Sequence, residues 1–327
     1  MDFDPEIRNI QIVSLAGGGF MGLFTAEFLA RLEADGVDFL GTTDVFAGTS
    51  AGSLIALGLA AGVPAKTIAA KMREKGEAIF PPKIAKANAI VSAIQHPKTA
   101  KYETTGLKEA LHDLVKTTKM GDLPRRALVP AVDMTAGTYR IFRGGVDGPD
   151  ANILVADVAL ASAAAPLYFP VHAIGSNLFA DGGLIANAPD AIAATEALHV
   201  LSGRAGRVKL LSVGTTLGAA GLAGSAIPND WGPAQWASRL LDYSMAGQVA
   251  LSRHMAETLL GADKVVTIDP LRSAEQNEVL ALDKANAEAV NTLNAMADRA
   301  ALNLTQSNRQ FVNLWKAHQA VSYWTPA

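Results

Sequence analysis

Two glycine-rich turns, each set between a β-rich run and an apolar helix-like run, constrain this fold more than any other feature. The first unit reads "IQIVSLA" (Ile10–Ala16), then glycines, then a helix predicted over Gly22–Ala34, where apolar residues recur at helical spacing. The second reads "DVFAGTS", followed by the apolar run "AGSLIALGLAAG". A strand, a tight glycine turn and a helix, repeated twice, predict a parallel sheet with helices on both faces.

The composition suits a large folded core and excludes several classes of site. Half of the 327 residues are hydrophobic and 18% are charged, which excludes a disordered chain. The 28 basic and 31 acidic residues give a net charge of −3, with no basic run typical of a nucleic-acid groove or a polybasic membrane anchor. The absence of cysteine excludes a disulfide framework, a cysteine nucleophile and a thiolate metal site. We expect a cytoplasmic protein, because the acidic start "MDFDPEIRNI" is not a secretory signal.

One uncharged stretch, Val45–Ala65, is long enough to cross a membrane. Its glycines, serines and proline instead favour a buried strand followed by a buried helix. We therefore expect no transmembrane segment there.

The rest of the chain predicts an α/β core followed by a largely helical C-terminal portion. Residues 65–118 are mostly helix-like, and "ALVPAVDM" and "TYRIFR" predict a hairpin or two adjacent strands. The runs "LVADVALASAAAP" and "APDAIAATEALHVL" predict helices, whereas "NLFADGGL" and Arg207–Thr215 predict strands. Beyond a Gly/Ala loop at 217–229, residues 231–260 and 273–321 are helix-like, apart from the strand "KVVTID".

The second turn, "GTSAG", matches the G-x-S-x-G pattern of a nucleophile elbow, with Ser50 between Gly48 and Gly52. A serine on a sharp strand-to-helix turn presents its hydroxyl at the N-terminus of the helix, where the helix dipole favours developing negative charge. Ser50 as an ordinary helix cap is the alternative interpretation.

A nucleophilic serine needs a base, and the chain offers two kinds of candidate. Among the histidines, His199 and His254 are the best placed, although both read as solvated helix residues. Asp181, in "ADGGLIANAP", follows a predicted strand and precedes Gly182 and Gly183, so that little bulk surrounds its carboxylate. A plain Asp-Gly turn is the alternative.

The first glycine turn also fits the G-x-G-x-x-G pattern of a dinucleotide-binding site, through Gly17, Gly19 and Gly22. That pattern requires an acidic residue at the end of the second strand. Asp44 is near the required distance, but it precedes "VFA" instead of ending it. The dinucleotide interpretation therefore remains the weaker alternative.

Four motifs in this order, "GGGFMG", "GTSAG", "SAAAPLYFP" and "DGG", resemble those of the patatin-like phospholipases over Ile10–Leu201. The resemblance implies a three-layer α/β/α fold related to the α/β hydrolases. It also implies catalysis by a Ser–Asp dyad, with no histidine, metal or other cofactor. The nucleophile is then Ser50 and the base Asp181. The first turn becomes the oxyanion hole, formed by Gly17, Gly18, Gly19 and Gly22.

The resemblance also divides the chain and implies a reaction. Residues 10–201 become the catalytic core, and residues 202–327 hold the last core strands and a helical portion that is a candidate regulatory cap. The implied reaction is two-step acyl transfer, in which Asp181 takes the proton of Ser50 as the hydroxyl attacks an ester carbonyl. Burial should raise the pKa of this carboxyl and make it a better base.

Several positions depart from the family pattern. Met21 stands where the glycine loop commonly carries an arginine. Leu160 and Ala163 replace an arginine and a serine of the alanine-rich helix, whereas Asn187 and Pro189 of the segment after the aspartate are kept. None of these departures alters the dyad.

The glycine-loop segment is most similar to a bacterial group, the phospholipase effectors of cyclic-oligonucleotide antiphage systems. That similarity implies a membrane phospholipid substrate at the inner face of the membrane, activation by a cyclic dinucleotide such as 3′,3′-cGAMP, and homo-oligomer formation on activation. It names no activator-binding residues. A carboxylesterase or thioesterase acting on soluble esters, and a non-catalytic lipid or nucleotide binder, remain the alternatives. Four tryptophans lie in the C-terminal portion: Trp231, Trp236, Trp315 and Trp324. We expect most of them to be packing residues, whereas an exposed one could contact lipid.

Overall fold

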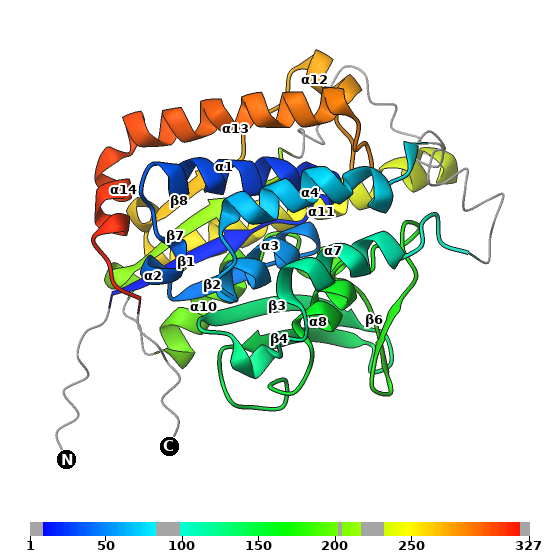
Figure 1. Ribbon diagram of the computed structural model, residues 1–327, viewed down its shortest axis with the longest axis horizontal. Helices are drawn as coiled ribbons and strands as arrows, with labels where there is room; N and C mark the ends of the chain where they lie inside the picture. Colours follow the sequence, from blue (N-terminus) through cyan, green and yellow to red (C-terminus); the bar gives the residue numbers. More distant parts are fainter. Residues whose placement is uncertain (1–8, 83–98, 202–204, 217–231, 321–327) are drawn as a thin grey trace.

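A mostly parallel sheet forms the centre of the protein (Figure 1). The computed structural model describes residues 9–82, 99–201, 205–216 and 232–320, and within them the sheet has eight strands. Seven follow the spatial order β5-β6-β3-β2-β1-β7-β8, and β4 also pairs with β3. The strands are β1 (Ile10–Leu15), β2 (Val45–Gly48), β3 (Arg126–Asp133), β4 (Thr138–Gly144), β5 (His172–Ile174), β6 (Asn177–Asp181), β7 (Val208–Val213) and β8 (Val265–Ile268).

The parallel half of the sheet brings the two predicted glycine turns together. Strand β1 pairs in parallel with both β2 and β7, and Leu15 lies opposite Gly48 at the carboxyl ends of β1 and β2. Because parallel strands end at the same edge, the turn after β1 and the turn after β2 are neighbours. The predicted parallel sheet is confirmed.

The other half of the sheet is antiparallel. Strands β3 and β4 form the predicted hairpin, and β6 runs antiparallel to β3, with Ala131 opposite Asp181. Strand β5, which was not predicted, forms a second hairpin with β6. It has only three residues, none of them fully buried, so its sequence carries no strand pattern.

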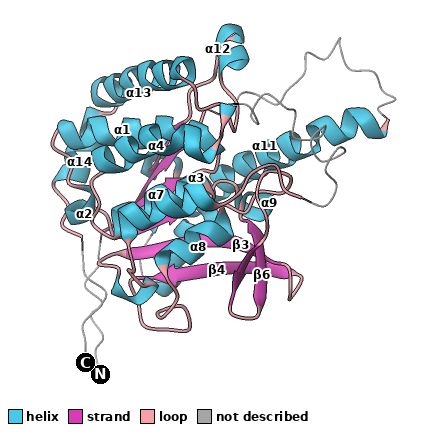
Figure 2. Ribbon diagram, turned by 45° about the vertical axis from the view of Figure 1, so that its right-hand side comes forward, coloured by secondary structure: helices cyan, strands magenta, loops and turns pink. Residues whose placement is uncertain are grey.

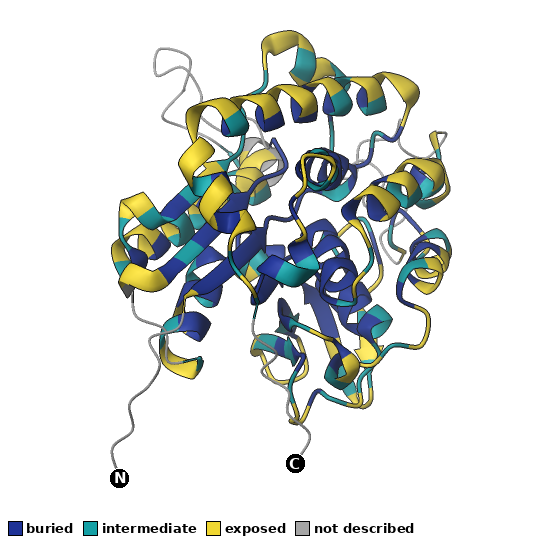
Figure 3. Cartoon of the chain, turned by 60° about the vertical axis from the view of Figure 1, so that its left-hand side comes forward, coloured by how far each residue is buried: buried dark blue, intermediate teal, exposed yellow. Residues whose placement is uncertain are grey.

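Helices cover both faces of the sheet, which confirms the three-layer α/β/α arrangement (Figures 1 and 2). One face carries α1 (Gly22–Ala34), α3 (Ala51–Ala60), α4 (Ala65–Ile79), α7 (Thr105–Val115), α8 (Val155–Ser162) and α13 (Ala287–Ser307). The opposite face carries α10 (Asp190–Thr195) and α11 (Pro233–Leu260). The shorter elements are α2 (Phe39–Thr42), α9 (Gly183–Ala186), a π-helical turn (Glu196–Val200), α12 (Ala274–Val279) and α14 (Arg309–Lys316). Buried residues concentrate in the sheet and on the inner helix faces (Figure 3).

The uncharged stretch Val45–Ala65 is part of this core. It forms β2 and α3, whose residues are all buried, and it ends at the first residue of α4. The interpretation as a buried strand and helix is therefore confirmed. Within the described ranges, no helix is both long enough and apolar enough to cross a membrane.

The chain beyond residue 201 contributes to the sheet as well as to the outer helices. Strand β7 lies between β1 and β8, next to the strand that leads into the first glycine turn. The region 273–321, predicted as helix-like, is broken by a loop at 280–286. The break occurs where the side chain of Asn286 caps α13 by accepting a hydrogen bond from the N–H of Ala289, at 2.9 Å. The predicted loop at 217–229 lies outside the described residues.

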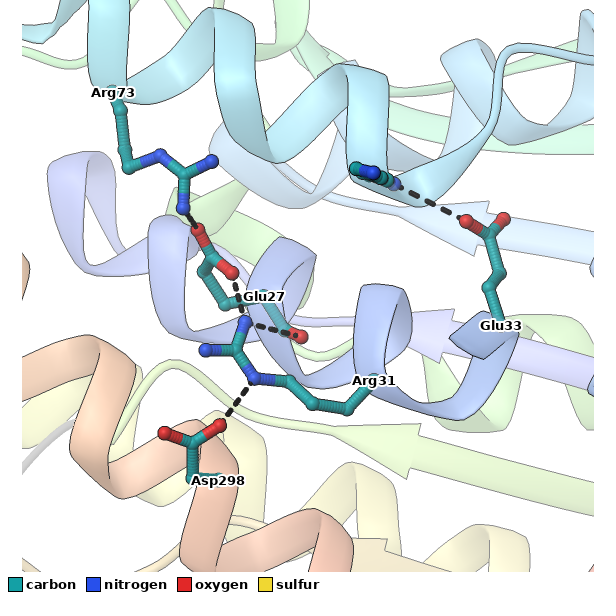
Figure 4. Close-up of polar contacts among 6 residues, drawn as sticks. Glu27, Arg31, Glu33, Arg73 and Asp298 are labelled. Carbon is teal, nitrogen blue, oxygen red and sulfur yellow. Dashed lines mark hydrogen bonds and ion pairs between the residues drawn. The ribbon is translucent and has the colours of Figure 1, made fainter. Parts of the chain in front are cut away.

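A group of ion pairs centred on the buried carboxylate of Glu27 connects helices α1, α4 and α13 (Figure 4). Glu27 of α1 is buried and forms ion pairs with Arg31 of the same helix and Arg73 of α4. Arg31 also donates through Nε to Asp298 of α13, at 2.6 Å. Two arginines offset the cost of burying one carboxylate, so α1, α4 and α13 are joined by charge as well as by packing.

Candidate active site

Ser50 occupies the sharp turn that the sequence predicts between β2 and α3. Its backbone has φ 53° and ψ −124°, a left-handed conformation that costs about 1–3 kcal/mol for a residue other than glycine. The flanking glycines make the turn sterically feasible. A side chain at Gly48 would collide with the carbonyl oxygen of Gly52, and one at Gly52 would collide with that of Leu15.

The side chain of Ser50 faces Asp181 instead of capping α3. Its Oγ donates to Asp181 Oδ2 at 2.7 Å, and it makes no capping hydrogen bond to the helix. Ser50 therefore stands at the N-cap position of α3, but its side chain does not act as the cap. The other carboxylate oxygen, Oδ1, accepts the N–H of Gly183 at 2.6 Å. The turn at Gly182 and Gly183 thus orients the carboxylate toward the serine, which a plain Asp-Gly turn does not require.

The environment of Asp181 makes its carboxylate a stronger base. Burial raises the pKa of Asp181 to about 6, and the hydrogen bonds from Gly183 and Ser50 oppose the rise only in part. The carboxylate is still ionised at neutral pH, yet it accepts a proton more readily than an exposed aspartate does.

A second serine, which the sequence reasoning missed, holds the turn around Ser50 in place. Ser162, at the end of α8, accepts the N–H of Ser50 at 3.0 Å and donates to the carbonyl of Pro130 at 2.7 Å. Its one signal in the sequence is a hydroxyl inside the small apolar run "LASAAAP", where the residue is completely buried. A buried polar group has to be hydrogen-bonded, and this one is bonded to the turn that carries Ser50.

The structure distinguishes among the four glycines predicted for the oxyanion hole. The N–H of Gly17 already donates to the carbonyl of Asn187 at 2.9 Å, and that of Gly22 donates to Gly19 within a short helical turn. The N–H groups of Gly18 and Gly19 make no hydrogen bond to the described parts of the chain. Both glycines line the cavity around the serine, as does Ala51, whose N–H likewise makes no hydrogen bond within the described residues. The sequence reasoning did not single out Ala51.

Two contacts fix the path of this glycine turn. Thr215, just beyond β7, donates through Oγ1 to the carbonyl of Gly17 at 2.9 Å. The N–H of Phe20 donates to the carbonyl of Leu282 at 2.7 Å, and Gly19 packs so closely on Leu282 that no side chain fits there. Both contacts come from the chain beyond residue 201, and neither has a recognisable sequence signal.

The loop that carries Leu282 is itself anchored by a buried ion pair. Asp283 Oδ2 accepts hydrogen bonds from Lys101 Nζ at 2.6 Å and from the hydroxyl of Tyr102 at 2.8 Å. Both partners in the ion pair are nearly buried. This anchor links the segment at 101–102 to the loop at 280–286, and through it to the oxyanion-hole candidates.

An apolar cavity opens from the serine between α4, α7 and α11. Its volume is about 140 Å³, comparable with a protein cavity that holds a six-carbon ring. The lining beyond the polar site is almost wholly apolar, with Ile68, Met72, Ile79, Phe80, Leu107, Leu114, Phe169, Leu241 and Met245 among its side chains. Such a cavity suits a hydrocarbon chain better than a sugar or a nucleotide.

The structure does not bring the alternative residues to this site. His199 and His254 are both exposed, and neither lines the cavity around Ser50. Asp44 lies at the amino end of β2, away from the glycine turns, where Oδ2 accepts the N–H of Gln11 at 2.7 Å. A histidine base and a dinucleotide site therefore find no support. In the part of the chain that the structure covers, no group of side chains is arranged to hold a metal ion.

The structure shows what surrounds the residues that depart from the family pattern, Met21, Leu160 and Ala163. Met21 is buried, and its Sδ lies 3.5 Å from Nη1 of Arg272, which also donates to the carbonyl of Leu280 at 3.2 Å. A cation from a distant part of the chain thus lies beside the position where the family carries its own arginine. Leu160 is buried in the core, and Ala163 lines the cavity.

Comparison with known proteins agrees with this geometry. The family model described as patatin-like phospholipase matches residues 13–194. The chain belongs to the patatin-like phospholipases. The resemblance found in its motifs is therefore confirmed, and with it the class of acyl hydrolases.

Individual patatin-like relatives match nearly the whole chain. A protein from Pseudomonas aeruginosa, named cGAMP-activated phospholipase, is 35% identical over 301 residues, which cover 90% of this chain and 89% of that protein. A protein of the same name from Vibrio cholerae is 29% identical over 346 residues, covering 96% and 97%. Among solved structures, human GIVD cytosolic phospholipase A2 aligns with 98% of this chain and 64% of its own, at 10% identity and a TM-score of 0.48.

Proposed function

We propose that the protein hydrolyses fatty-acyl esters of membrane phospholipids, with Ser50 as nucleophile and Asp181 as base, and that a cyclic dinucleotide such as 3′,3′-cGAMP switches it on. The observation that carries the catalytic part is the 2.7 Å hydrogen bond between Ser50 Oγ and a buried, more basic Asp181, both of which line an apolar cavity. The serine supplies the nucleophile, the aspartate the base, and the cavity a place for the acyl chain.

In the first half-reaction, Asp181 Oδ2 takes the proton as Ser50 Oγ attacks the ester carbonyl. The N–H groups of Gly18 and Gly19, which make no hydrogen bond to any described residue, would stabilise the oxyanion that forms, and each such donor contributes on the order of 10²–10³ in rate. The leaving alcohol or lysolipid takes the proton from Asp181 and departs, which leaves an acyl ester on Ser50.

In the second half-reaction, water replaces the alcohol. Asp181 takes a proton from the water as its oxygen attacks the acyl ester, and it returns that proton to Ser50 Oγ when the fatty acid leaves. One carboxylate thus acts as base and then as acid in each half. No cofactor is required for this scheme.

The proposed activation rests on the relatives. Two of them are named cGAMP-activated phospholipases and align over nearly their whole length. We propose the same activator here, with action at the inner face of the bacterial membrane during antiphage defence, and homo-oligomer formation on activation. The chain beyond residue 201 is the proposed regulatory portion, because it supplies the Thr215 and Leu282 contacts to the glycine turn.

The test is hydrolysis of phospholipid vesicles by the purified protein, with and without a panel of cyclic dinucleotides. Activity that requires 3′,3′-cGAMP and disappears in Ser50→Ala and Asp181→Asn would support both parts. Constitutive activity lost in both variants would refute the activation alone, and hydrolysis of soluble esters only would indicate a carboxylesterase. Activity that survives Asp181→Asn would show that another group is the base.

A further inference from the structure

The wall of the apolar cavity carries exposed apolar side chains directly beside those that line it. Pro166 and Tyr168 line the cavity, and Leu167 between them is 39% exposed. In α9, Leu184 lines the cavity and its neighbour Ile185 is 38% exposed.

The same alternation occurs on the first half of α11. Leu241 and Met245 line the cavity, whereas Leu240 is 56% exposed and Trp236, one turn before it, is 48% exposed. Trp236 thus differs from Trp315, which is buried as expected of a packing residue. Trp231 and Trp324 lie outside the described residues.

These segments form one continuous region. Helices α9 and α11 lie side by side (Figure 2). Both helices line the cavity, as does the 165–169 segment. Soluble proteins rarely gather exposed apolar side chains at one place without an interaction that uses them. Leu167, Ile185, Trp236 and Leu240 are exposed within segments that wall the cavity, whereas other exposed leucines, such as Leu251 and Leu302, lie away from it.

The backbone of Leu167 is strained. Its φ of +72° is unfavourable for leucine, by about 1–3 kcal/mol, and its carbonyl accepts the N–H of Lys101 at 3.0 Å. Such strain persists only where the surrounding structure fixes it, and it concentrates at functional positions. A half-exposed leucine in a strained conformation beside the cavity fits that pattern.

We propose that Leu167, Ile185, Trp236 and Leu240 form a docking rim that inserts into the surface of a phospholipid bilayer. This inference rests on the proposed function, since a phospholipid has to pass its acyl chain from the bilayer to Ser50. A rim continuous with the cavity lets that chain pass without crossing water, which removes most of the cost of extracting it. Tryptophan suits such a boundary because its ring is apolar and its N–H is polar.

The binding test separates docking from chemistry by using the inactive Ser50→Ala protein. Vesicles of phosphatidylethanolamine and phosphatidylglycerol are sedimented with this protein, with and without 3′,3′-cGAMP. The rim variant Ile185→Ser/Leu240→Ser should bind roughly tenfold more weakly, from the apolar area no longer buried in lipid. The matched control, Leu251→Ser/Leu302→Ser, removes two leucines that are 60% and 56% exposed and line no part of the cavity, so its binding should be unchanged.

The activity test uses the same substitutions with Ser50 intact. The rim variant should lose vesicle hydrolysis but keep the hydrolysis of a soluble short-chain ester, which needs no bilayer. Unaltered vesicle binding by the rim variant, an equal loss in the control, or an equal loss on the soluble ester would each overturn the docking rim. A failure of the proposed function would give a different result. The protein with Ser50 intact would then not hydrolyse vesicles, whereas vesicle binding by the Ser50→Ala protein would still differ between the rim variant and the control.

Discussion

Replacing Asp181 by asparagine should inactivate the protein and make it more stable at neutral pH. Burial raises the pKa of Asp181 from 3.8 to about 6, so the folded protein holds a proton on this carboxyl at pH values where the unfolded chain has released it. The free energy of unfolding therefore falls as pH rises between these two values. Above about pH 6 the folded state carries the full cost of a buried carboxylate.

The size of the cost follows from the pKa difference. A rise from 3.8 to about 6 corresponds to about 3 kcal/mol. Asparagine removes the charge and still fits, because its Oδ1 accepts the Gly183 N–H and its amide nitrogen lies within reach of Ser50 Oγ. In a chain of this length, about 3 kcal/mol corresponds to a rise in Tm of roughly 4 °C.

Thermal unfolding of the wild type and Asp181→Asn, followed by circular dichroism, checks this. The variant should be more stable by about 3 kcal/mol near pH 7.5, and the gap should shrink to roughly a third near pH 4.5. Asp133→Asn is the matched control with the opposite sign, because hydrogen bonds from Ala136 and Asn177 lower the pKa of Asp133. Equal Tm values for the wild type and Asp181→Asn at both pH values would refute the burial argument.

Three further outcomes follow from the site. On a soluble ester, kcat/KM should rise with pH to a plateau with an inflection near 6, because Asp181 must be ionised to act as base; an inflection near 4 would mean that its carboxyl is not perturbed. Gly18→Ala would collide with Thr215, so kcat should fall on the order of 10²–10³ with an unchanged far-ultraviolet spectrum; retained activity would place the oxyanion hole elsewhere. Asp283→Asn removes the anionic end of a buried ion pair, so unfolding in urea should become easier by about 3–5 kcal/mol, and kcat of the folded protein should fall. The control Glu196→Gln breaks another buried ion pair and should lose stability without losing kcat.

Local features were predictable because their causes lie in adjacent residues. The helix Gly22–Ala34 has the predicted bounds, since its apolar period and Gly36 just beyond its end are both visible in the sequence. The elbow around Ser50 is likewise predictable, because only glycines at 48 and 52 allow the strand and the helix to approach so closely. The βα order then fixes which edge of the sheet carries the turns.

Contacts between distant segments were not predictable from local patterns. The pairing of Ser50 with Asp181 depends on the register between β3 and β6; the local pattern offered Asp181 only as one candidate base, and the family resemblance chose it over the histidines. Ser162 and Leu282 act through one hydroxyl and one backbone carbonyl, neither of which differs chemically from many others in the chain. Backbone acceptors in particular leave no mark in a sequence, because every residue carries one.

Leu282, whose carbonyl holds the glycine turn, is synthesised after Ser50 and Asp181, and this order has a consequence for synthesis of the protein on the ribosome. A growing chain acquires Ser50 and Asp181 long before the carbonyl that accepts the Phe20 N–H emerges. Strand β7, which lies beside β1, also emerges only after Asp181. We therefore expect nascent chains to lack a finished glycine turn until the residues near Leu282 have emerged, so that incomplete copies of the enzyme should be inactive.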